Sequence, residues 1–515
     1  MDTLDSIVLL VYILAVTGFG LLFYRRASNT EGFTVANRRL PGWVIGLSIF
    51  GTYLSSISFL ALPGKAYSSN WSILAFALSL PIAAYAATRW FIPLYRSTRD
   101  ISAYAYLERR FGLWARMYAA LFYLLTQLAR MGTIIFLVAL ALQSLTDWNI
   151  VYIILITGVI ITLYTVVGGI EAVIWTDALQ SIVLTLGAIT CVVILLVAMP
   201  GGAEQIFVIA NAQEKFSLGS FQLVFTEPTF WVILIYGLVI NLQNFGIDQS
   251  YVQRYQAAVS TKEAAKSVWI GALIYIPVGM LFLFVGSALF SFYQAQPELL
   301  PAALQAEDAA DKIFPYFIAT ELPSGVRGLL IAALFAAAMS SVDTSINSSA
   351  TILMTDGYQR LFNPAADQRS QIMFLRTVTV ILGTLGTGTA LLMISIKSAL
   401  DVWWNLAGIF SGGMIGLFLL GILSRRARSV EAGIAVVIGL IVIVWAALSS
   451  KLGWPVTNPL HPLMTTVVGT LSIFLIGVLI SRRHHRKGYK KPAQTIYDLQ
   501  ELEFADETTV INDDQ

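Results

Sequence analysis

Apolar stretches of about 20 residues recur along this chain, and short clusters of charged residues separate them. A stretch of that length, folded as a helix, can cross the hydrocarbon core of a bilayer. Hydrophobic residues make up 57% of the 515 residues and charged residues only 12%. That charged share is about half of what a globular protein carries. The pattern predicts an all-α polytopic membrane protein, because helices satisfy their own backbone hydrogen bonds in lipid.

The apolar runs predict thirteen transmembrane helices. Their predicted bounds are 5–24, 41–66, 71–95, 113–145, 149–168, 171–199, 229–247, 263–293, 324–352, 372–395, 398–422, 430–449 and 462–481. The connecting segments alternate in Lys and Arg content: residues such as Arg25, Arg109 and Arg254 lie on one side, and scattered residues such as Lys65 and Lys215 on the other. Since positively charged loops stay cytoplasmic, we expect an external N-terminus and a cytoplasmic C-terminus.

Spans two to eleven form two groups of five, with one leading helix and two trailing helices. Five is odd, so a second copy of such a group must enter the membrane from the opposite face, as an inverted repeat. The predicted parts are 1–40 (leading helix and cytoplasmic loop), 41–199 (first repeat), 200–228 (extracellular loop), 229–424 (second repeat), 425–481 (two trailing helices) and 482–515 (cytoplasmic tail).

Each group of five opens with a polar, glycine-containing helix. The first carries Gly51, a run of hydroxyl side chains and Pro63-Gly64, and the second carries Gly237, Asn241 and two further polar residues before Gly246. Such segments at matching places in two halves indicate discontinuous helices around a site at the membrane midplane. The alternative is that small and hydroxyl residues simply allow close helix packing.

Among the ionisable residues inside predicted spans, three stand out: Arg130, Asp177 and Asp343. Each such residue costs roughly 2.5–3.5 kcal/mol on insertion scales, so it is expected to have a function or a buried partner. For Arg130 the functional interpretation is a guanidinium that grips a solute carboxylate. The alternative is a structural pair with a backbone carbonyl or a buried carboxylate.

A stripe of oxygen-bearing side chains lies around Asp343. Ser340, Asp343, Thr344 and Asn347 follow the i, i+3, i+4, i+7 spacing that places residues on one face of a helix. Oxygen ligands suit a hard cation. Because the hydroxyls are neutral, a monovalent ion can bind and leave, which favours Na⁺ over Ca²⁺. The alternative is that the hydroxyls form hydrogen bonds between helices.

Catalytic machinery is not expected in this chain. Cys191 is the one cysteine and lies in an apolar run, and the three histidines lie at or beyond the ends of spans. We therefore expect no enzymatic activity and no catalytic residues. The expected partners are a small solute, Na⁺ and the lipid bilayer, with no nucleic acid and no obligate protein partner.

Four segments carry a resemblance to a known family: FGTYLSSISFLALPGKAY in the second span, YTVVGGIEAVIWTDALQ at 164–180, DQSYVQRYQAA at 248–258, and IAALFAAAMSSVDTSINSSATIL at 331–353. Between about Phe33 and Arg426 the chain resembles the sodium:solute symporter family, and within it the bacterial sialic acid symporters. The resemblance implies the leucine-transporter fold, with two inverted five-helix repeats.

The resemblance also implies specific sites. A first Na⁺ site would use the carbonyls of Gly51, Leu54 and Ala337 with the hydroxyls of Ser340 and Ser341. A second Na⁺ site would use Asp177, Ser340, Asp343 and Thr344. Solute contacts would be Tyr53, Ser55, Ser58, Arg130, Asn241 and Asn244.

The chain departs from this pattern at several of these positions. Asp343 and Thr344 fall where serines occur in sialic acid carriers, so the number of ions (one or two) and the choice between Na⁺ and a proton at Asp343 stay open. Tyr53 replaces a small hydroxyl residue, and Ala77 lies near the place of an expected glutamine.

The expected function is Na⁺-coupled import by alternating access in a bacterial inner membrane. The expected solute is a carboxylate-bearing sugar acid such as sialic acid. A symporter of neutral sugars or polyols is the alternative within the same family. An ion channel is a more remote alternative, which two broken helices without a repeated pore loop argue against.

Overall fold

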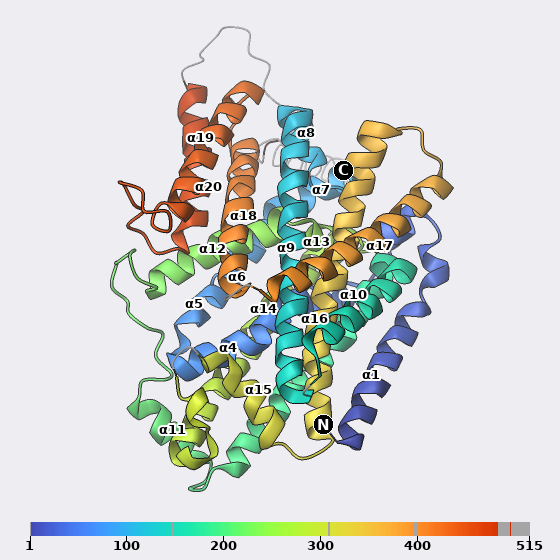
Figure 1. Cartoon of the computed structure of the whole chain (residues 1–515). Helices are drawn as coiled ribbons and strands as arrows, with labels where there is room; N and C mark the ends of the chain where they lie inside the picture. Colours follow the sequence, from blue (N-terminus) through green and yellow to red (C-terminus); the bar gives the residue numbers. More distant parts are fainter. Residues whose placement is uncertain (1, 147, 307–308, 396–398, 483–494, 496–515) are drawn as a thin grey trace, which may run out of the picture.

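The computed structural model describes residues 2–146, 148–306, 309–395, 399–482 and 495. Over these residues the regular structure is helical, apart from one isolated bridge between Leu40 and Ala258. Figure 1 shows the helices packed side by side, with α11, α15 and the N-terminus toward the same end. The predicted tail after Arg482 lies outside the described residues, except for Thr495.

The helices in chain order are α1 (Thr3–Leu21), α2 (Thr30–Val35), α3 (Gly42–Tyr53), α4 (Ser56–Ser68), α5 (Leu74–Leu78), α6 (Leu80–Ala86), α7 (Ile92–Thr98), α8 (Ala105–Phe111), α9 (Leu113–Thr146), α10 (Ile150–Ala198), α11 (Ala203–Ala212), α12 (Phe230–Ile247), α13 (Gln249–Gln256), α14 (Thr261–Ala295), α15 (Ala310–Thr320), α16 (Val326–Ile352), α17 (Gln368–Met393), α18 (Ala399–Leu423), α19 (Ser429–Leu448) and α20 (Met464–Arg482). In the described part of the chain, ten helical segments are long and apolar enough to cross a membrane, or eleven if α3 and α4 form one broken span.

Two predicted spans, 149–168 and 171–199, appear as the single element α10 of 49 residues. The element is bent at Gly169, where φ is 58° and ψ is −163°. A side chain at Gly169 would stand 3.0 Å from the backbone of Phe33, so glycine is needed for both its conformation and its close contact. The chain changes direction here without a loop, which is why α10 counts once among the ten segments.

The first predicted break is present between α3 and α4. The two helices meet at a bend of 55°, and Leu54 leaves helical geometry with φ −91° and ψ 73°. Backbone carbonyls near Leu54 are therefore released from regular helical hydrogen bonding.

The second break does not lie at the glycines of 229–247, because α12 is continuous through Gly237 and Gly246. A side chain at Gly237 would stand 2.8 Å from the Phe76 Cα atom, so this glycine serves close packing. The break lies at Asp248, and the chain continues as α13.

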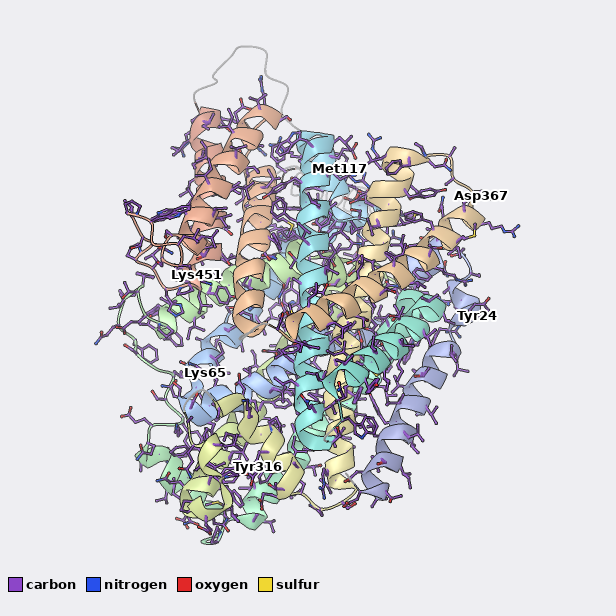
Figure 2. All side chains as sticks on the ribbon, in the orientation of Figure 1. Tyr24, Lys65, Met117, Tyr316, Asp367 and Lys451 are labelled. Atoms are coloured by element: carbon purple, nitrogen blue, oxygen red, sulfur yellow. The ribbon has the colours of Figure 1, made fainter. Side chains whose placement is uncertain are left out.

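Helix α16 forms the centre of the molecule. Every residue from Leu330 to Ile352 is buried, and the helix contacts α1, α3, α9, α10 and α17. Figure 2 shows that side chains fill the spaces around this bundle, with Tyr316 at one end and Met117 and Asp367 toward the other. The polar stripe predicted on this segment therefore faces protein and not lipid.

A short backbone link joins the residue before α3 to the segment between α13 and α14. The Leu40 N–H donates to the Ala257 carbonyl at 3.0 Å, and the Val259 N–H donates to the Leu40 carbonyl at 3.1 Å. Leu40 lies just before α3, and Val259 lies between α13 and α14. The two interrupted helices are thus fastened together at one end.

Candidate ion and solute site

Helices α3, α10 and α16 converge at Gly51. A Cβ atom added to Gly51 would stand 2.4 Å from Ser181 Oγ, 3.3 Å from Ser340 Oγ and 3.4 Å from the Asp177 carbonyl oxygen. A small cavity at this point is lined by Phe50, Gly51, Leu54, Gln180, Ser181, Leu184, Ala336, Ala337 and Ser340. The structure therefore brings together four of the five residues predicted for the first Na⁺ site, and it adds Gln180 and Ser181 from α10.

Several buried polar atoms near this cavity have few or no hydrogen-bond partners among the described residues. The Ser341 hydroxyl and the Gln180 side-chain amide make no geometric hydrogen bond, and the Ser340 hydroxyl faces the Asp177 carboxylate. A buried polar group without a partner costs about 1–3 kcal/mol. A bound cation would remove that cost, and oxygen donors of this kind suit a hard ion. The residues present thus fit Na⁺ as a transported substrate.

Replacing Gly51 with alanine is expected to weaken activation by Na⁺. The new methyl group would displace the Ser181 hydroxyl from its bonds to the Leu47 carbonyl (3.0 Å) and the Asp177 carbonyl (2.7 Å), and would crowd Ser340. Overpacking costs about 1–3 kcal/mol, so the half-saturating Na⁺ concentration should rise about tenfold or more. Uptake measured against Na⁺ concentration tests this. Gly388→Ala is the control, because nothing lies within 4 Å of its Cβ position.

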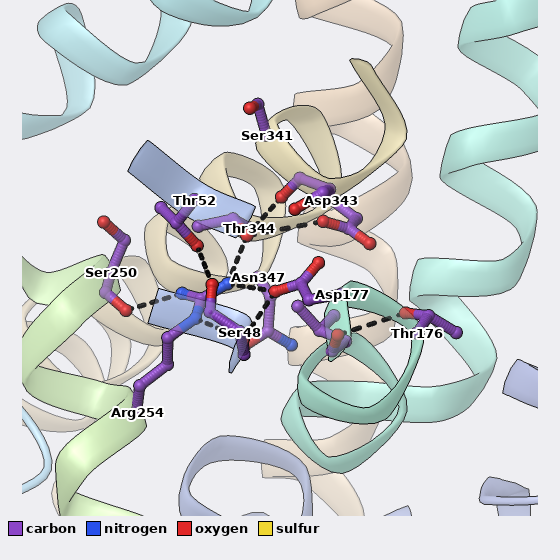
Figure 3. A network of polar contacts seen from close by, with 12 residues as sticks. Ser48, Thr52, Thr176, Asp177, Ser250, Arg254, Ser341, Asp343, Thr344 and Asn347 are labelled. Atoms are coloured by element: carbon purple, nitrogen blue, oxygen red, sulfur yellow. Dashed lines mark hydrogen bonds and ion pairs between the residues drawn. The ribbon is translucent and has the colours of Figure 1, made fainter. Parts of the chain in front are cut away.

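The predicted second Na⁺ site contains a guanidinium. Arg254 is completely buried and donates from Nη2 to Asp177 Oδ2 at 2.7 Å, from Nε to Ser48 Oγ at 2.8 Å and from Nη1 to the Ser250 carbonyl at 2.6 Å. Its Nη2 also donates to Thr344 Oγ1. Ser48 donates in turn to Asp177 Oδ2 at 2.6 Å. Figure 3 shows Arg254 reaching from its own helix into the middle of this group.

The assignment of Arg254 to a cytoplasmic loop is therefore wrong. All eight residues of α13, Gln249–Gln256, are buried, so this polar segment is packed inside the protein. Gln253 on the same helix donates from Nε2 to the Thr34 carbonyl at 2.5 Å and to Asn347 Oδ1 at 2.9 Å. The hydropathy of this segment does not indicate that it is buried. Only the family motif DQSYVQRYQAA singled the segment out in the sequence.

Asp343 is the second buried carboxylate of the network. Its Oδ2 accepts a hydrogen bond from the Tyr164 hydroxyl, and no ion pair to Asp343 occurs within the described ranges. Thr344 donates to the Ser340 carbonyl at 2.5 Å, which leaves its oxygen facing Arg254. In Figure 3, Ser341 points away from the guanidinium. The predicted face of α16 is thus engaged by α10 and α13.

The residues predicted for the solute gather at the break between α3 and α4. Arg130 is half-buried, donates from Nη2 to the Thr52 carbonyl at 3.0 Å, and has no ion-pair partner in the part of the chain that the structure describes. Ser55 is buried at the break, and Ser58 donates to the Tyr53 carbonyl at 3.5 Å. Arg130 therefore places a positive charge next to the released backbone, and the buried Asp248 carboxylate lies close enough to interact with it electrostatically.

Tyr53 lies in an aromatic cage. Its ring centroid is 5.3 Å from that of Phe245, 4.9 Å from that of Tyr251 and 5.5 Å from that of Tyr275. The Tyr53 hydroxyl is buried and lies near the side chain of Asn244, which was also predicted to contact solute. Aromatic faces beside such polar groups form a surface that suits a ring-shaped solute.

Asn241 has a structural use. Its Nδ2 donates to the Phe76 carbonyl at 3.2 Å and to Ser79 Oγ at 2.9 Å, which ties α12 to the α5–α6 segment. Asn244 lies three residues further along α12 and is half-buried. Of the two asparagines predicted to contact solute, Asn241 thus has both amide hydrogens engaged within the protein.

A separate cluster of ion pairs joins α8, α9 and the π-helical segment Leu353–Phe362 that follows α16. Arg116 contacts Glu108 Oε2 at 2.8 Å and Asp356 Oδ1 at 2.5 Å, and Arg360 contacts Glu108 Oε1 at 2.5 Å. The hydrogen bond from Arg360 lowers the pKa of Glu108, so this carboxyl is ionised at neutral pH. The cluster contains a second buried, paired arginine that is separate from the Gly51 cavity.

Comparison with known proteins gives consistent matches over most of the chain. The model described as the sodium:solute symporter family matches residues 33–439. The sodium/sialic acid symporter NanT of Aliivibrio fischeri is 36% identical over 475 residues, which cover 91% of this chain and 93% of the relative. The sodium/sialic acid symporter SiaT of Proteus mirabilis is 35% identical over 480 residues, which cover 92% of this chain and 93% of the relative.

Solved structures agree with these matches. A Na⁺-coupled sialic acid symporter in a substrate-bound outward-open state superposes with a TM-score of 0.87 at 31% identity, covering 94% of this chain and 98% of that chain. A nucleobase-cation-symport-1 family transporter shares the fold with a TM-score of 0.57 at 17% identity, covering 88% of this chain and 94% of that chain.

Proposed function

This chain belongs to the sodium:solute symporter family, and from that membership we propose that it imports a carboxylate-bearing sugar acid such as sialic acid together with Na⁺. Relatives and a solved structure that are named for sialic acid support the solute class, each matching more than nine-tenths of the chain. The observation that carries the proposal is Arg130 beside the broken helix, half-buried and without an ion-pair partner in the described part of the chain, because a carboxylate is the natural partner of such a guanidinium.

The proposed architecture has thirteen spans, arranged as the leucine-transporter fold. In this arrangement α3 and α4 form one span, α10 supplies two spans on either side of Gly169, and α18 completes the second repeat. Residues 41–199 and 229–424 would be the inverted repeats, with α1 leading and α19 and α20 trailing. The alternation of Lys and Arg between loops supports an external N-terminus and a cytoplasmic C-terminus in a bacterial inner membrane.

The proposed coupling runs through the broken second span. Na⁺ at Gly51, Leu54, Ala337, Ser340 and Ser341 would hold the α3 break against α16. Arg130 contacts the carbonyl of Thr52, one residue after Gly51, so ion and solute share the same few residues of backbone. Two ligands that order the same segment favour each other's binding, typically by 1–3 kcal/mol. The membrane potential would add about 2.3 kcal/mol per charge per 100 mV to inward movement.

Replacing Arg130 with alanine is expected to weaken uptake of the acidic solute strongly. A hydrogen bond to a charged group contributes about 1.5–3 kcal/mol, so the apparent solute affinity should fall about 10- to 150-fold. Uptake of radiolabelled sialic acid into proteoliposomes under an inward Na⁺ gradient measures the loss. Arg369→Ala, an exposed residue with the same charge change, is the control.

The same variant separates the two solute classes. A carrier of neutral sugars or polyols would keep its transport rate in Arg130→Ala. Retained uptake of the labelled acid by this variant would therefore contradict the proposed function. If the Arg369→Ala control also lost sialic acid uptake, the loss in Arg130→Ala could not be attributed to the position of Arg130.

A further inference from the structure

We propose that the end of α1 and the adjoining part of α17 bind the headgroup of an anionic phospholipid, with Arg376 as the group that contacts the lipid phosphate. This lipid site is separate from the ion and solute site, and the coupling scheme above does not use it. Its place in the cytoplasmic leaflet rests on the proposed topology, in which α1 ends and α17 begins at the cytoplasmic face.

Arg376 lies on the side of α17 that faces lipid. It is about two turns into the helix and inside the predicted span 372–395. Met373 and Val380, three residues before it and four residues after it, share its side of the helix and are 63% and 47% exposed. In a bilayer this side of α17 meets acyl chains. A charged side chain at such a place is costly unless it has a partner.

No carboxylate pairs with Arg376 in the described part of the chain. The residue is half-buried, and its Cζ atom lies over the ring of Tyr24, 5.2 Å from the ring centroid. Its Nε atom is buried and has no hydrogen-bond partner among the described residues. The aromatic ring attracts the guanidinium, but it does not neutralise its charge. The structure therefore leaves a positive charge at the lipid-facing surface that calls for an anion.

A second positive charge lies close by in the sequence. Arg26, two residues after Tyr24, donates from Nη1 to Glu171 Oε1 at 2.8 Å, and Arg39 donates from Nη2 to Glu171 Oε2 at 2.6 Å. Two guanidiniums thus share one carboxylate, and both arginine side chains are largely exposed. One positive charge remains uncompensated here, in addition to that of Arg376.

Exposed aromatic side chains mark the level of the lipid headgroups at this end of α1. Tyr24 and Trp43 are both exposed. The Trp43 ring packs against Trp175 at 5.8 Å, and Trp175 stacks on Phe23 at 6.5 Å. Tyrosine and tryptophan concentrate at membrane–water interfaces. Figure 2 shows Tyr24 and Asp367, the residue before α17, at the same edge of the bundle.

A phospholipid of negative net charge fits this surface. Its phosphate oxygens can accept two parallel hydrogen bonds from the Arg376 guanidinium. Its acyl chains would lie along the exposed side chains of Met373 and Val380. A choline headgroup carries its own ammonium, which the two positive charges would repel. Basic groups between transmembrane helices at the cytoplasmic side are typical of sites for anionic lipids.

A purely structural role is the competing explanation for Arg376. In that case the residue only fastens α17 to α1 through its contact with Tyr24. Its removal would then lower the stability of the protein equally in every lipid. If Arg376 binds a lipid phosphate, the effect of its removal depends on whether an anionic lipid is present.

The first test follows the melting temperature of the purified wild-type protein in detergent during titration with a lipid. Phosphatidylglycerol should raise the melting temperature in a saturable manner, because a ligand that binds the native state stabilises it. Phosphatidylcholine and inorganic phosphate should raise it little, which separates a lipid headgroup from a free phosphate ion. Equal shifts with phosphatidylglycerol and phosphatidylcholine, or an equal shift with inorganic phosphate, would overturn the proposal.

The second test compares Arg376→Gln with Arg369→Gln. In Arg376→Gln the phosphatidylglycerol concentration that gives the half-maximal shift should rise about tenfold, since a charged hydrogen-bond donor to the phosphate is lost. Arg369→Gln makes the same charge change at an exposed residue near the start of α17, and its half-maximal concentration should stay within about twofold of the wild type.

A melting temperature of Arg376→Gln that is lowered by the same amount with and without phosphatidylglycerol would show that the residue only fastens the two helices. A tenfold weakening in Arg369→Gln as well would show that net charge, and not a site at Arg376, attracts the lipid. If Arg376→Gln does not fold, the comparison of the two lipids on the wild-type protein decides.

Discussion

Alanine at both Ser340 and Ser341 should abolish Na⁺-stimulated uptake. Both hydroxyls are buried, Ser340 lines the Gly51 cavity, and the Ser341 hydroxyl has no hydrogen-bond partner among the described residues, so both would lose the ion as a partner. A polar contact to a charged group contributes about 1.5–3 kcal/mol, and two such contacts about 3–6 kcal/mol. The affinity for Na⁺ should therefore fall roughly 10²- to 10⁴-fold. Uptake into proteoliposomes over a range of Na⁺ concentrations measures this change.

Ser345→Ala is the matched control for this double replacement. Ser345 lies on the same helix, and its hydroxyl donates to the Ser341 carbonyl at 2.9 Å, as is usual within a helix. Its removal should leave the Na⁺ dependence within about twofold of the wild type, since one neutral intrahelical bond contributes little. An unchanged Na⁺ dependence in Ser340→Ala, Ser341→Ala protein would disprove the proposed ion site.

Replacing Asp177 with asparagine is expected to destabilise the protein by about 3–5 kcal/mol. The reason is that the Arg254 guanidinium stays buried after its ion-pair partner Asp177 has been neutralised. Breaking a buried ion pair from one side costs more than the pair contributes, because the remaining charge is not solvated. Denaturant titration of the purified protein in detergent gives the change in the free energy of unfolding.

The double variant Asp177→Asn, Arg254→Gln should recover most of that stability. Removing both charges leaves neutral amides that can hydrogen-bond, so the two effects are strongly non-additive. Glu171→Gln is the control on the same helix, because its partners Arg26 and Arg39 are 54% and 45% exposed and can be solvated without it. A double variant as unstable as the sum of the two single variants would contradict the ion-pair explanation.

The helices were predictable from sequence because their length and apolar character are set locally. The ends and bends of the helices were less predictable. The chain turns at the single residue Gly169, and no loop-like segment in the sequence predicts this turn. The second break was expected among the glycines of 229–247, whereas it lies at Asp248, because close contact with Phe76 is what requires Gly237.

The candidate site was predictable where the residues share one helix face. Ser340, Asp343 and Thr344 were expected to point inward together, and their burial agrees with that expectation. Arg254 could not be placed in the same way, since a polar segment with a positive charge resembles a cytoplasmic loop. Its burial depends on α13 docking against α3 and α16, and such tertiary packing leaves no local pattern.

The pair of main-chain bonds at Leu40 restricts how the two interrupted helices can swing. Both bonds involve Leu40, which leads into α3. Their partners Ala257 and Val259 lie in the segment between α13 and α14. A rocking motion that keeps both bonds must rotate α3 and α13 about this shared point. The largest displacement then occurs at the ends of these helices that lie far from Leu40. If one of the two breaks straightened, the movement would reach the other break directly through the peptide backbone, and no side chain would be needed to transmit it.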